Sequence, residues 1–174
     1  MTDSVLYELK GRVALITLNR PDKLNALDTR SFEELNEHLA ALENSADSIG
    51  CVVLRGEGKG FCAGADLNAM GKLPVAPVFK PGVIERLGCL PQPVIAEVHG
   101  VCYTGGLELI LACDFIVADI TARFADTHGK WGLAGAWGMG QRLPRRIGLP
   151  QAKRMMMTSR TVAATEAQAL GLVD

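Results

Sequence analysis

The segment PVIAEVHGVCYTGGLELILACDF, residues 93–115, decides how this chain folds. It begins with a run of apolar and β-branched residues at 93–98, which is typical of a buried strand. A turn with several glycines follows at 100–106, and an apolar helix is expected at 105–112. Another buried strand is expected at 114–119. Strands that alternate with helical segments indicate an α/β protein.

The same alternation extends toward the N-terminus. Residues 5–10 and 12–18 are apolar and β-branched on either side of Lys10-Gly11, so they are predicted to be two strands joined by a turn. CVVLR at 51–55 has the composition of a further buried strand, and the glycine-rich loop GEGKG at 56–60 ends it. This half of the chain therefore supplies more strands to the same core.

A helix is predicted at about 29–44, between these strands. Its apolar residues recur at helical spacing and form one buried stripe: Phe32, Leu35, Leu39 and Leu42. Either Asp28 or Ser31 would cap the N-terminus of this helix. Ser31 together with Glu34 also matches the pattern of a capping box.

The rest of the chain is less regular. The stretch Gly71–Pro93 contains several prolines, and we interpret it as a mobile, loop-rich segment with one short helix at 82–89. Residues 124–143 are rich in glycine. Helices are expected at about 150–158 and 164–170.

Composition and charge narrow the class of protein. The 174 residues predict one domain, residues 1–174, and a content of 48% hydrophobic and 21% charged residues is typical of a soluble globular protein. The net charge of −1 does not support a nucleic-acid-binding face. The longest apolar stretch, 107–118, is too short to span a bilayer, and the N-terminus does not resemble a signal peptide. We therefore expect a cytoplasmic protein with no nucleic-acid partner and no membrane span.

Two segments expose backbone N–H groups suited to binding a developing negative charge. FCAGADL at 61–67 is built of small residues that let a ligand approach the main chain, although a tight turn needs small residues too. Gly105 and Gly106 open the apolar helix, and the first N–H groups of a helix have no partner within it. Donors of this kind stabilise an oxyanion.

Glu108 is a candidate acid–base residue, and His128 is either a structural or solvent-facing histidine or a catalytic one. Glu108 lies in the first turn of the apolar helix, where it would either cap the helix or have its pKa raised by apolar surroundings toward general acid–base work. His128 lies in the glycine-rich segment 124–143, which matches neither a P-loop nor a dinucleotide fingerprint. No pair of cysteines or histidines has zinc-ligand spacing, so no metal site is expected.

These segments together resemble the crotonase family, the enoyl-CoA hydratase/isomerase superfamily. The matching stretches follow the family's order: ITLNRPDKLNALD (16–28), GEGKGFCAGADL (56–67), residues 93–115, and the run from QRLPRRIG to LGLVD (141–174). The resemblance implies a crotonase-like spiral of ββα turns in place of a doubly wound sheet. It also implies a CoA thioester ligand with no tightly bound cofactor.

The resemblance carries the family's site onto this chain residue by residue. The two oxyanion-hole N–H groups match Ala65 and Gly105, and the first of the two catalytic glutamates matches Glu108. The second glutamate matches His128, which is the main departure from the family pattern. The residues expected to bind CoA are Lys23, Asn25, Ala26, Leu27, Ala63, Ala65, Asp66 and Leu67. Arg20, Lys23 and Lys59 are candidates to meet the CoA phosphates. Trp131 and Trp137 either line the acyl pocket or pack in the core.

The function that this resemblance implies is hydration of a 2-trans-enoyl-CoA, with Glu108 as general acid–base and His128 as a second acid–base or water-orienting group. One alternative is a non-catalytic acyl-CoA-binding or shuttle protein. Another is a different crotonase reaction: double-bond isomerisation, thioester hydrolysis or decarboxylation. The family normally continues past LGLVD into a C-terminal helical region that helps build trimers and hexamers. We therefore expect a core that lacks this region, and a homotrimer or hexamer for the full-length form.

Overall fold

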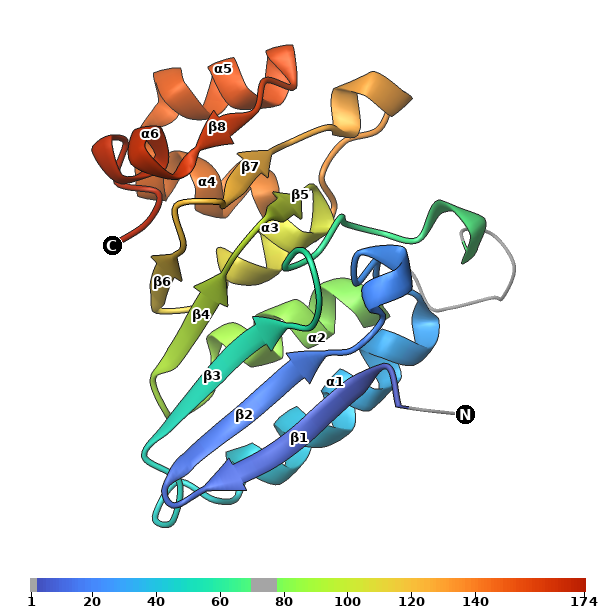
Figure 1. Ribbon diagram of the computed structural model, residues 1–174, viewed down its shortest axis with the longest axis vertical. Helices are drawn as coiled ribbons and strands as arrows, with labels where there is room; N and C mark the ends of the chain where they lie inside the picture. The colour runs from blue at the N-terminus through green and yellow to red at the C-terminus, as the bar shows by residue number, and fades with distance from the viewer. Residues whose placement is uncertain (1–2, 70–77) are drawn as a thin grey trace.

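The computed structural model describes residues 3–69 and 78–174 (Figure 1). A five-stranded sheet has the order β1-β2-β3-β4-β6. β1 and β2 are antiparallel, and β2, β3, β4 and β6 run parallel to one another. The bounds of these strands are Val5–Lys10 (β1), Val13–Leu18 (β2), Cys51–Gly56 (β3), Val94–Val98 (β4) and Phe115–Ala118 (β6). The predicted α/β class is confirmed.

A second, smaller sheet lies beyond the end of the first (Figure 1). Its order is β5-β7-β8, with β5 and β7 parallel and β7 and β8 antiparallel. The strands are very short: Val101–Tyr103 (β5), Arg123–Ala125 (β7) and Val162–Ala163 (β8). β4 continues into β5 and β6 into β7, so two strands of the first sheet pass directly into strands of the second. This repetition gives the spiral that the resemblance implied.

Helices pack around both sheets. α1 (Thr29–Glu43) and α2 (Phe79–Gly88) lie together behind the first sheet in Figure 1, and α3 (Gly105–Ile110) joins β5 to β6. The C-terminal third adds α4 (Met139–Ile147), α5 (Leu149–Thr158) and α6 (Ala164–Ala169) around the small sheet. The described residues also contain three short 3-10 turns: Pro21–Lys23, Leu67–Ala69 and His128–Trp131.

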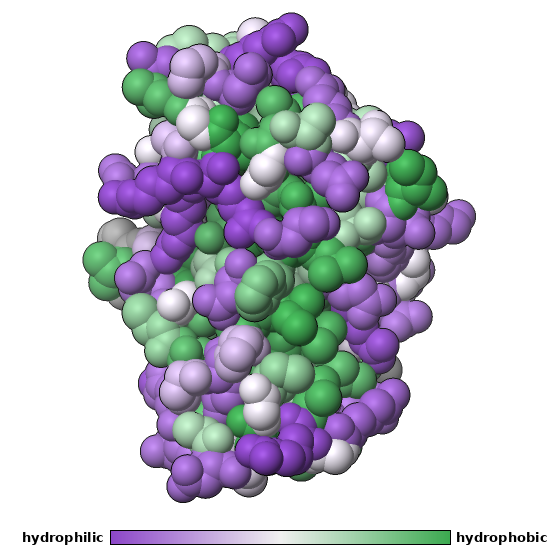
Figure 2. All heavy atoms as spheres, turned by 90° about the vertical axis from the view of Figure 1, so that its left-hand side faces the viewer, coloured by the Kyte–Doolittle hydropathy of each residue, from purple (hydrophilic) through white to green (hydrophobic). Residues whose placement is uncertain are grey.

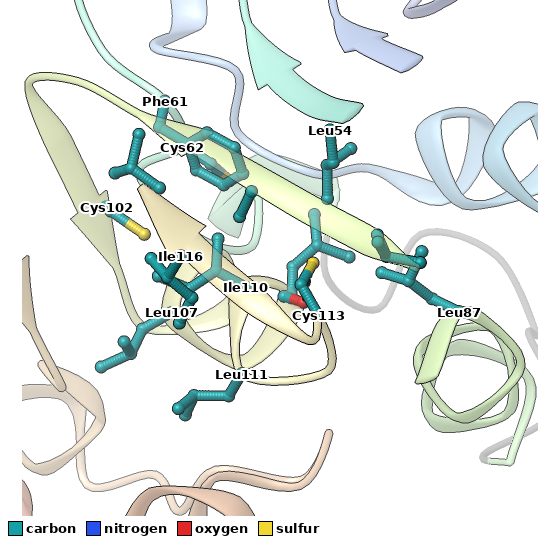
Figure 3. Close-up of a cluster of buried hydrophobic side chains, with 14 of the residues drawn as sticks. Leu54, Phe61, Cys62, Leu87, Cys102, Leu107, Ile110, Leu111, Cys113 and Ile116 are labelled. Atoms are coloured by element: carbon teal, nitrogen blue, oxygen red, sulfur yellow. Dashed lines mark hydrogen bonds between the residues drawn. The ribbon is translucent and has the colours of Figure 1, made fainter. Parts of the chain in front are cut away.

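The core lies between the first sheet and its helices and extends around α3. Every residue of α3 is buried, because the helix is inserted between the two sheets. Figure 3 shows the side chains of Leu107 and Ile110 among Phe61, Cys62 and Ile116. Burying a side chain of this size contributes about 2 kcal/mol. This packing holds the N-terminus of α3 in place, which is where the candidate site lies.

One exposed face of the molecule is rich in apolar side chains. Figure 2 views the side on which the edge strand β6 lies, and hydrophobic side chains gather there. Phe115 and Val117 of β6 are half exposed, and Ile120 just after it is more exposed still.

Several details of the expected elements need correction. The turn expected at 100–106 contains β5, and the glycine-rich segment 124–143 contains the start of α4. Neither element shows a clear periodicity of apolar residues in the sequence, because β5 has only three residues and α4 contains Pro144. The helix expected at 82–89 is α2, which begins earlier, at Phe79. Residues 71–77 of the expected mobile segment lie outside the described residues.

The proposed capping box of α1 is wrong. Asp28 is the N-cap, and its Oδ1 accepts hydrogen bonds from the N–H of Ser31 at 2.8 Å and from the Ser31 hydroxyl at 2.9 Å. Glu34 turns away from the helix end. Its Oε2 accepts from the N–H groups of Ser4 and Val5 at 2.7 and 2.8 Å. Glu34 therefore fastens the start of β1 to the helix.

Candidate active site

A cavity of about 410 Å³ lies at the N-terminus of α3, between the two sheets and the C-terminal third. Segments that are far apart in sequence contribute to its wall. Its lining residues are Ala63, Ala65, Leu67, Thr104, Glu108, Thr127, His128, Trp131, Leu133, Ala134, Ala136 and Trp137. The wall is mostly apolar, with a few polar groups among the lining residues, which is the usual character of a small-molecule site.

The loop after β3 lies directly against β5, and this contact forms one side of the cavity. The N–H of Cys62 donates to the carbonyl of Val101 at 2.9 Å, and the N–H of Tyr103 donates to the carbonyl of Cys62 at 2.9 Å. Gly64 has a φ of +108°, and a Cβ there would collide with the hydroxyl of Thr104. Only glycine fits both conditions. The loop therefore reaches Ala65 in close contact with the start of α3.

Ala65 and Gly105 each have a backbone N–H without a partner in the described part of the chain. Ala65 forms a parallel bridge with Leu27, but that bridge uses the N–H groups of Leu27 and Asp66. Gly105 is the first residue of α3, so its N–H has no acceptor within the helix. The structure thus places the two segments that the sequence singled out next to each other, and their role as oxyanion donors stays a prediction.

Glu108 is buried, with a side chain only 1% exposed. Its Oε1 accepts hydrogen bonds from the N–H of Trp137 at 2.7 Å and from the N–H of Met139 at 3.1 Å. Burial raises the pKa of Glu108 above its ordinary value, and these two hydrogen bonds and the charge of His128 oppose the rise. The carboxylate is thus held by one oxygen, which leaves Oε2 available.

His128 begins the 3-10 turn after β7, and its ring lies between two carboxylates. Its Nδ1 is 2.6 Å from Oδ1 of Asp126, and its Nε2 is 3.9 Å from Oε2 of Glu108. The hydrogen bond to Asp126 raises the pKa of His128, burial opposes the rise, and the charges of Asp126 and Glu108 add to it. The structure therefore brings Glu108 and His128, which the sequence singled out, together on the wall of the cavity.

The gap between Glu108 and His128 suits a water molecule. A separation of 3.9 Å is too long for a direct hydrogen bond. An oxygen atom at about 2.8 Å from each atom would hydrogen-bond both of them. The pair can thus hold a water and exchange a proton with it.

The predicted CoA-binding residues fall into two groups. Ala63, Ala65 and Leu67 line the cavity. Asn25 is only 1% exposed, and its side chain is used internally: Oδ1 accepts from the N–H of Arg20, and Nδ2 donates to the carbonyls of Glu57 and Gly60. Buried Leu27, after the half-buried Ala26, pairs with the loop through Ala65. The second group supports the loop from behind.

Charged residues cluster beside this loop. The guanidinium of Arg20 is 3.0 Å from Asp66 and 3.1 Å from Asp28, so it is already engaged with carboxylates. Partial burial opposes ionisation of Asp66, but hydrogen bonds from Arg20 and Asn68 and the charges of Arg20 and Lys23 lower its pKa. Lys23 is exposed in the nearby 3-10 turn, and Lys59 is exposed as well. Both lysines remain accessible for phosphate groups.

Both tryptophans line the cavity, as the sequence predicted. Trp137 packs edge-on against Phe32 with ring centroids 4.9 Å apart. Its benzene ring also lies against Gly105, where a Cβ would overlap it. Trp131 is 61% exposed. The loop that carries both rings is therefore anchored through Trp137.

Sequence reasoning missed Asp126 as part of this site. The signal was present, because a carboxylate two residues before a histidine can reach the imidazole around a turn. In the described residues, no group of three His, Cys, Asp or Glu side chains is arranged to hold a metal ion. Of the helices in residues 3–69 and 78–174, none combines the length and apolar character needed to cross a bilayer.

Comparisons with known proteins agree on one family. The family model described as enoyl-CoA hydratase/isomerase matches residues 8–174. A short-chain-enoyl-CoA hydratase of Clostridium acetobutylicum is 35% identical over 99% of this chain and 68% of its own length. The crystal structure of an enoyl-CoA hydratase from Bacillus anthracis superposes with a TM-score of 0.92 at 36% identity, covering 98% of this chain and 68% of that one. The structure of a monofunctional enoyl-CoA isomerase from M. smegmatis superposes with a TM-score of 0.84 at 38% identity. The match covers 99% of this chain and 76% of that one. The chain thus spans about two thirds of the length of most of these relatives.

Proposed function

The chain belongs to the enoyl-CoA hydratase/isomerase family, and we propose that it adds water to the double bond of a 2-trans-enoyl-CoA. The observation that carries this proposal is the pair formed by Glu108 and His128. Their side chains are 3.9 Å apart on the wall of a cavity that Ala65 also lines. CoA is part of the substrate here, and no tightly bound cofactor is needed for the chemistry.

The oxyanion hole is formed by the N–H groups of Ala65 and Gly105. Attack of water on the β-carbon moves negative charge onto the thioester oxygen, which becomes enolate-like. Two fixed donors stabilise this charge, and the loss of one such donor typically costs about 3 kcal/mol in activation free energy. The contact between the loop and the N-terminus of α3 supports this assignment.

Glu108 and His128 divide the proton transfers. Glu108 accepts a proton from the water as the water oxygen bonds to the β-carbon. His128, as the imidazolium, donates a proton to the α-carbon, and the enolate collapses to the saturated thioester. A proton then passes from Glu108 to His128 through the next water, which restores the starting state. The hydrogen bond to Asp126 favours the imidazolium form of His128 and so raises its pKa.

CoA lies along the loop at residues 63–67 and along residues 25–27, which lie behind that loop. Ala63, Ala65 and Leu67 contact the ligand from the cavity wall, and Ala26 and Leu27 lie behind this loop, where Leu27 pairs with Ala65. Asp66 and Asn25 position this loop, and Lys23 is the candidate for a phosphate contact because it is exposed beside Asp66. One domain, residues 1–174, provides all of these groups.

The test is an assay of the purified chain with crotonyl-CoA, followed at the absorbance of the conjugated thioester. Hydration by the wild type, and loss of hydration in Glu108→Ala, are the expected results. Full hydration by Glu108→Ala contradicts the role of Glu108. Measurement of crotonyl-CoA binding to both proteins, by calorimetry, separates loss of chemistry from loss of binding.

The same assay distinguishes the alternatives. Binding of the thioester without turnover would indicate a non-catalytic acyl-CoA-binding protein. A product other than the 3-hydroxyacyl thioester, identified by mass spectrometry on a panel of CoA thioesters, would indicate another reaction of the family. Assembly into a homotrimer or hexamer is a separate proposal, and size-exclusion chromatography with light scattering tests it.

A further inference from the structure

Asp126 is a buried carboxylate that interacts with His128. It lies at the end of β7 and is 2% exposed. Within the described residues, both hydrogen bonds that it accepts come from His128: the backbone N–H at 3.1 Å and Nδ1 at 2.6 Å. No lysine or arginine of the described chain forms an ion pair with it. Its environment is therefore defined by His128.

A buried carboxylate without a cation or strong donors is unfavourable. In Asp126 the deficit is met by a ring N–H at short range, which is a strong hydrogen bond. A carboxylate at this position is thus stable only if the imidazole of His128 turns Nδ1 toward it. Asp126 in turn fixes the rotation of the His128 ring through the same hydrogen bond.

The bond also determines which nitrogen of His128 carries a proton. An ionised carboxylate only accepts hydrogen bonds, so Nδ1 is the protonated nitrogen. In the neutral imidazole the lone pair is then on Nε2, the atom that faces Oε2 of Glu108 at 3.9 Å. Nε2 can accept a proton from the cavity and return it there.

We infer that Asp126 is a positioning residue that holds His128 in the Nδ1–H tautomer with Nε2 directed at Glu108. Glu108, His128 and Asp126 then form one chain of proton-handling groups. The kinetic part of this inference rests on the proposed hydration. The tautomer of His128 does not depend on it.

Two carboxylates act on His128, and one further charged side chain lies near it. Asp126 from the end of β7 and Glu108 from α3 both favour the imidazolium. Lys153 of α5 lines, together with Asp126 and His128, a neighbouring cavity of about 470 Å³. A Lys153→Met variant therefore measures the effect of that charge without removing the hydrogen bond of Asp126.

The direct test is ¹⁵N NMR of the two ring nitrogens of His128 over a pH titration. In the wild type we expect the Nδ1–H tautomer above the pKa. In Asp126→Asn the side-chain amide can donate to Nδ1, so we expect the Nε2–H tautomer and a lower pKa for His128. An unchanged tautomer and pKa in Asp126→Asn would overturn the inference.

Asp119→Asn is the matched control for the backbone turn. Oδ1 of Asp119 accepts from the N–H of Thr121 at 2.7 Å, two residues on, as Oδ1 of Asp126 does from the N–H of His128. Asp119 is exposed and lines neither of the two cavities that include His128. We expect this variant to leave the His128 signals unchanged.

The kinetic test is a double-mutant cycle with crotonyl-CoA. We expect Asp126→Asn to lower kcat about 10- to 100-fold, as loss of an orienting partner of a histidine commonly does, with little change in KM. In a His128→Gln background the same substitution should have no further effect, because Asp126 acts through His128. An equal loss in both backgrounds would contradict the inference. Absence of hydration by the wild type would contradict the proposed function, while the NMR titration would still decide the role of Asp126.

Discussion

Oε2 of Glu108 lies 3.9 Å from Nε2 of His128, while the other oxygen of the same carboxylate is bound by the N–H groups of Trp137 and Met139. The loop that carries Trp137 therefore sets the orientation of Glu108. Because Oε1 is used for structure, Oε2 is the oxygen that chemistry can use.

Glu108→Gln separates these two uses. The amide oxygen of Gln can still accept from Trp137 and Met139, so we expect the fold and its Tm to be kept. The amide cannot take a proton from water, so kcat for hydration of crotonyl-CoA should fall at least about 100-fold. Glu97→Gln, on an exposed position of β4, is the control and should match the wild type. Retention of kcat in Glu108→Gln would refute acid–base work by Glu108.

The raised pKa of His128 makes the stability of the fold depend on pH. Since the folded chain binds the imidazole proton more tightly than the unfolded chain, this contribution is complete below the ordinary pKa of 6.5 and is lost as the pH rises through the folded pKa. Burial also raises the pKa of Glu108, which likewise lowers stability with rising pH, from its ordinary value of 4.5 upward.

We therefore expect the free energy of unfolding to fall as the pH rises above about 6.5, and His128→Gln to remove most of this fall. Urea denaturation at a series of pH values measures it. The series stops at about pH 8, because burial raises the pKa of the Cys62 thiol to about 12 and ionisation of that thiol in the unfolded chain would add a separate decline above this range. An equally steep fall in His128→Gln would contradict the assignment to His128.

Much of the fold was predictable because its long elements have clear periods. The strands at 5–10 and 51–55 and the helix at about 29–44 have enough residues for their apolar pattern to appear. β5 and β7 have three residues each, so no period exists to be read. Their pairing is decided by contacts between distant segments, such as that of Cys62 with Val101 and Tyr103.

The site was predictable to a similar degree. Small residues at 63–65 and a carboxylate at Glu108 are visible in the sequence, and so is the histidine at 128. The hydrogen bonds from the backbone of Trp137 and Met139 to Glu108 are not visible, because any residue type supplies the same N–H. The internal role of Asn25 was hidden for a related reason: its three partners are all backbone groups.

Asn25→Ala should act on stability more than on chemistry. The substitution leaves the N–H of Arg20 and the carbonyls of Glu57 and Gly60 without their partner, which should cost about 3 kcal/mol in unfolding free energy. Asn25 also has a φ of +54°, so Asn25→Gly should be about 1 kcal/mol less damaging than Asn25→Ala. Chemical denaturation measures both.

The control for Asn25 is Asn44→Ala. Asn44 is exposed and makes one side-chain hydrogen bond, to the carbonyl of Ala40, so its loss should change stability by no more than about 0.5 kcal/mol. Should Asn25→Ala keep full stability and lose only affinity for the thioester, the side chain would be a ligand contact and not a support of the loop.

Glu34→Ala should loosen the start of β1. The carboxylate accepts from the N–H groups of Ser4 and Val5, so removal should cost about 1–2 kcal/mol and speed hydrogen exchange at those two amides. Glu33→Ala, at the exposed neighbouring position, is the matched control. Faster exchange confined to the first turn of α1 would instead favour the capping box that the structure contradicts.

Gly105→Ala tests the close contact between the oxyanion donor and the tryptophan loop. The added Cβ would overlap the benzene ring of Trp137, so the ring or the N-terminus of α3 must move. Overpacking of this kind costs about 1–3 kcal/mol, and displacement of the Gly105 N–H should lower kcat as well. Trp137→Leu makes room for the Cβ, so the double variant should regain part of the stability lost in Gly105→Ala.

Gly140→Ala is the control, because a Cβ there meets nothing within 4 Å and alanine suits a helix better, so this variant should be neutral or more stable. Strictly additive losses for Gly105→Ala and Trp137→Leu would mean that the two residues do not share the contact, and that the position of the Gly105 donor is independent of the loop that orients Glu108.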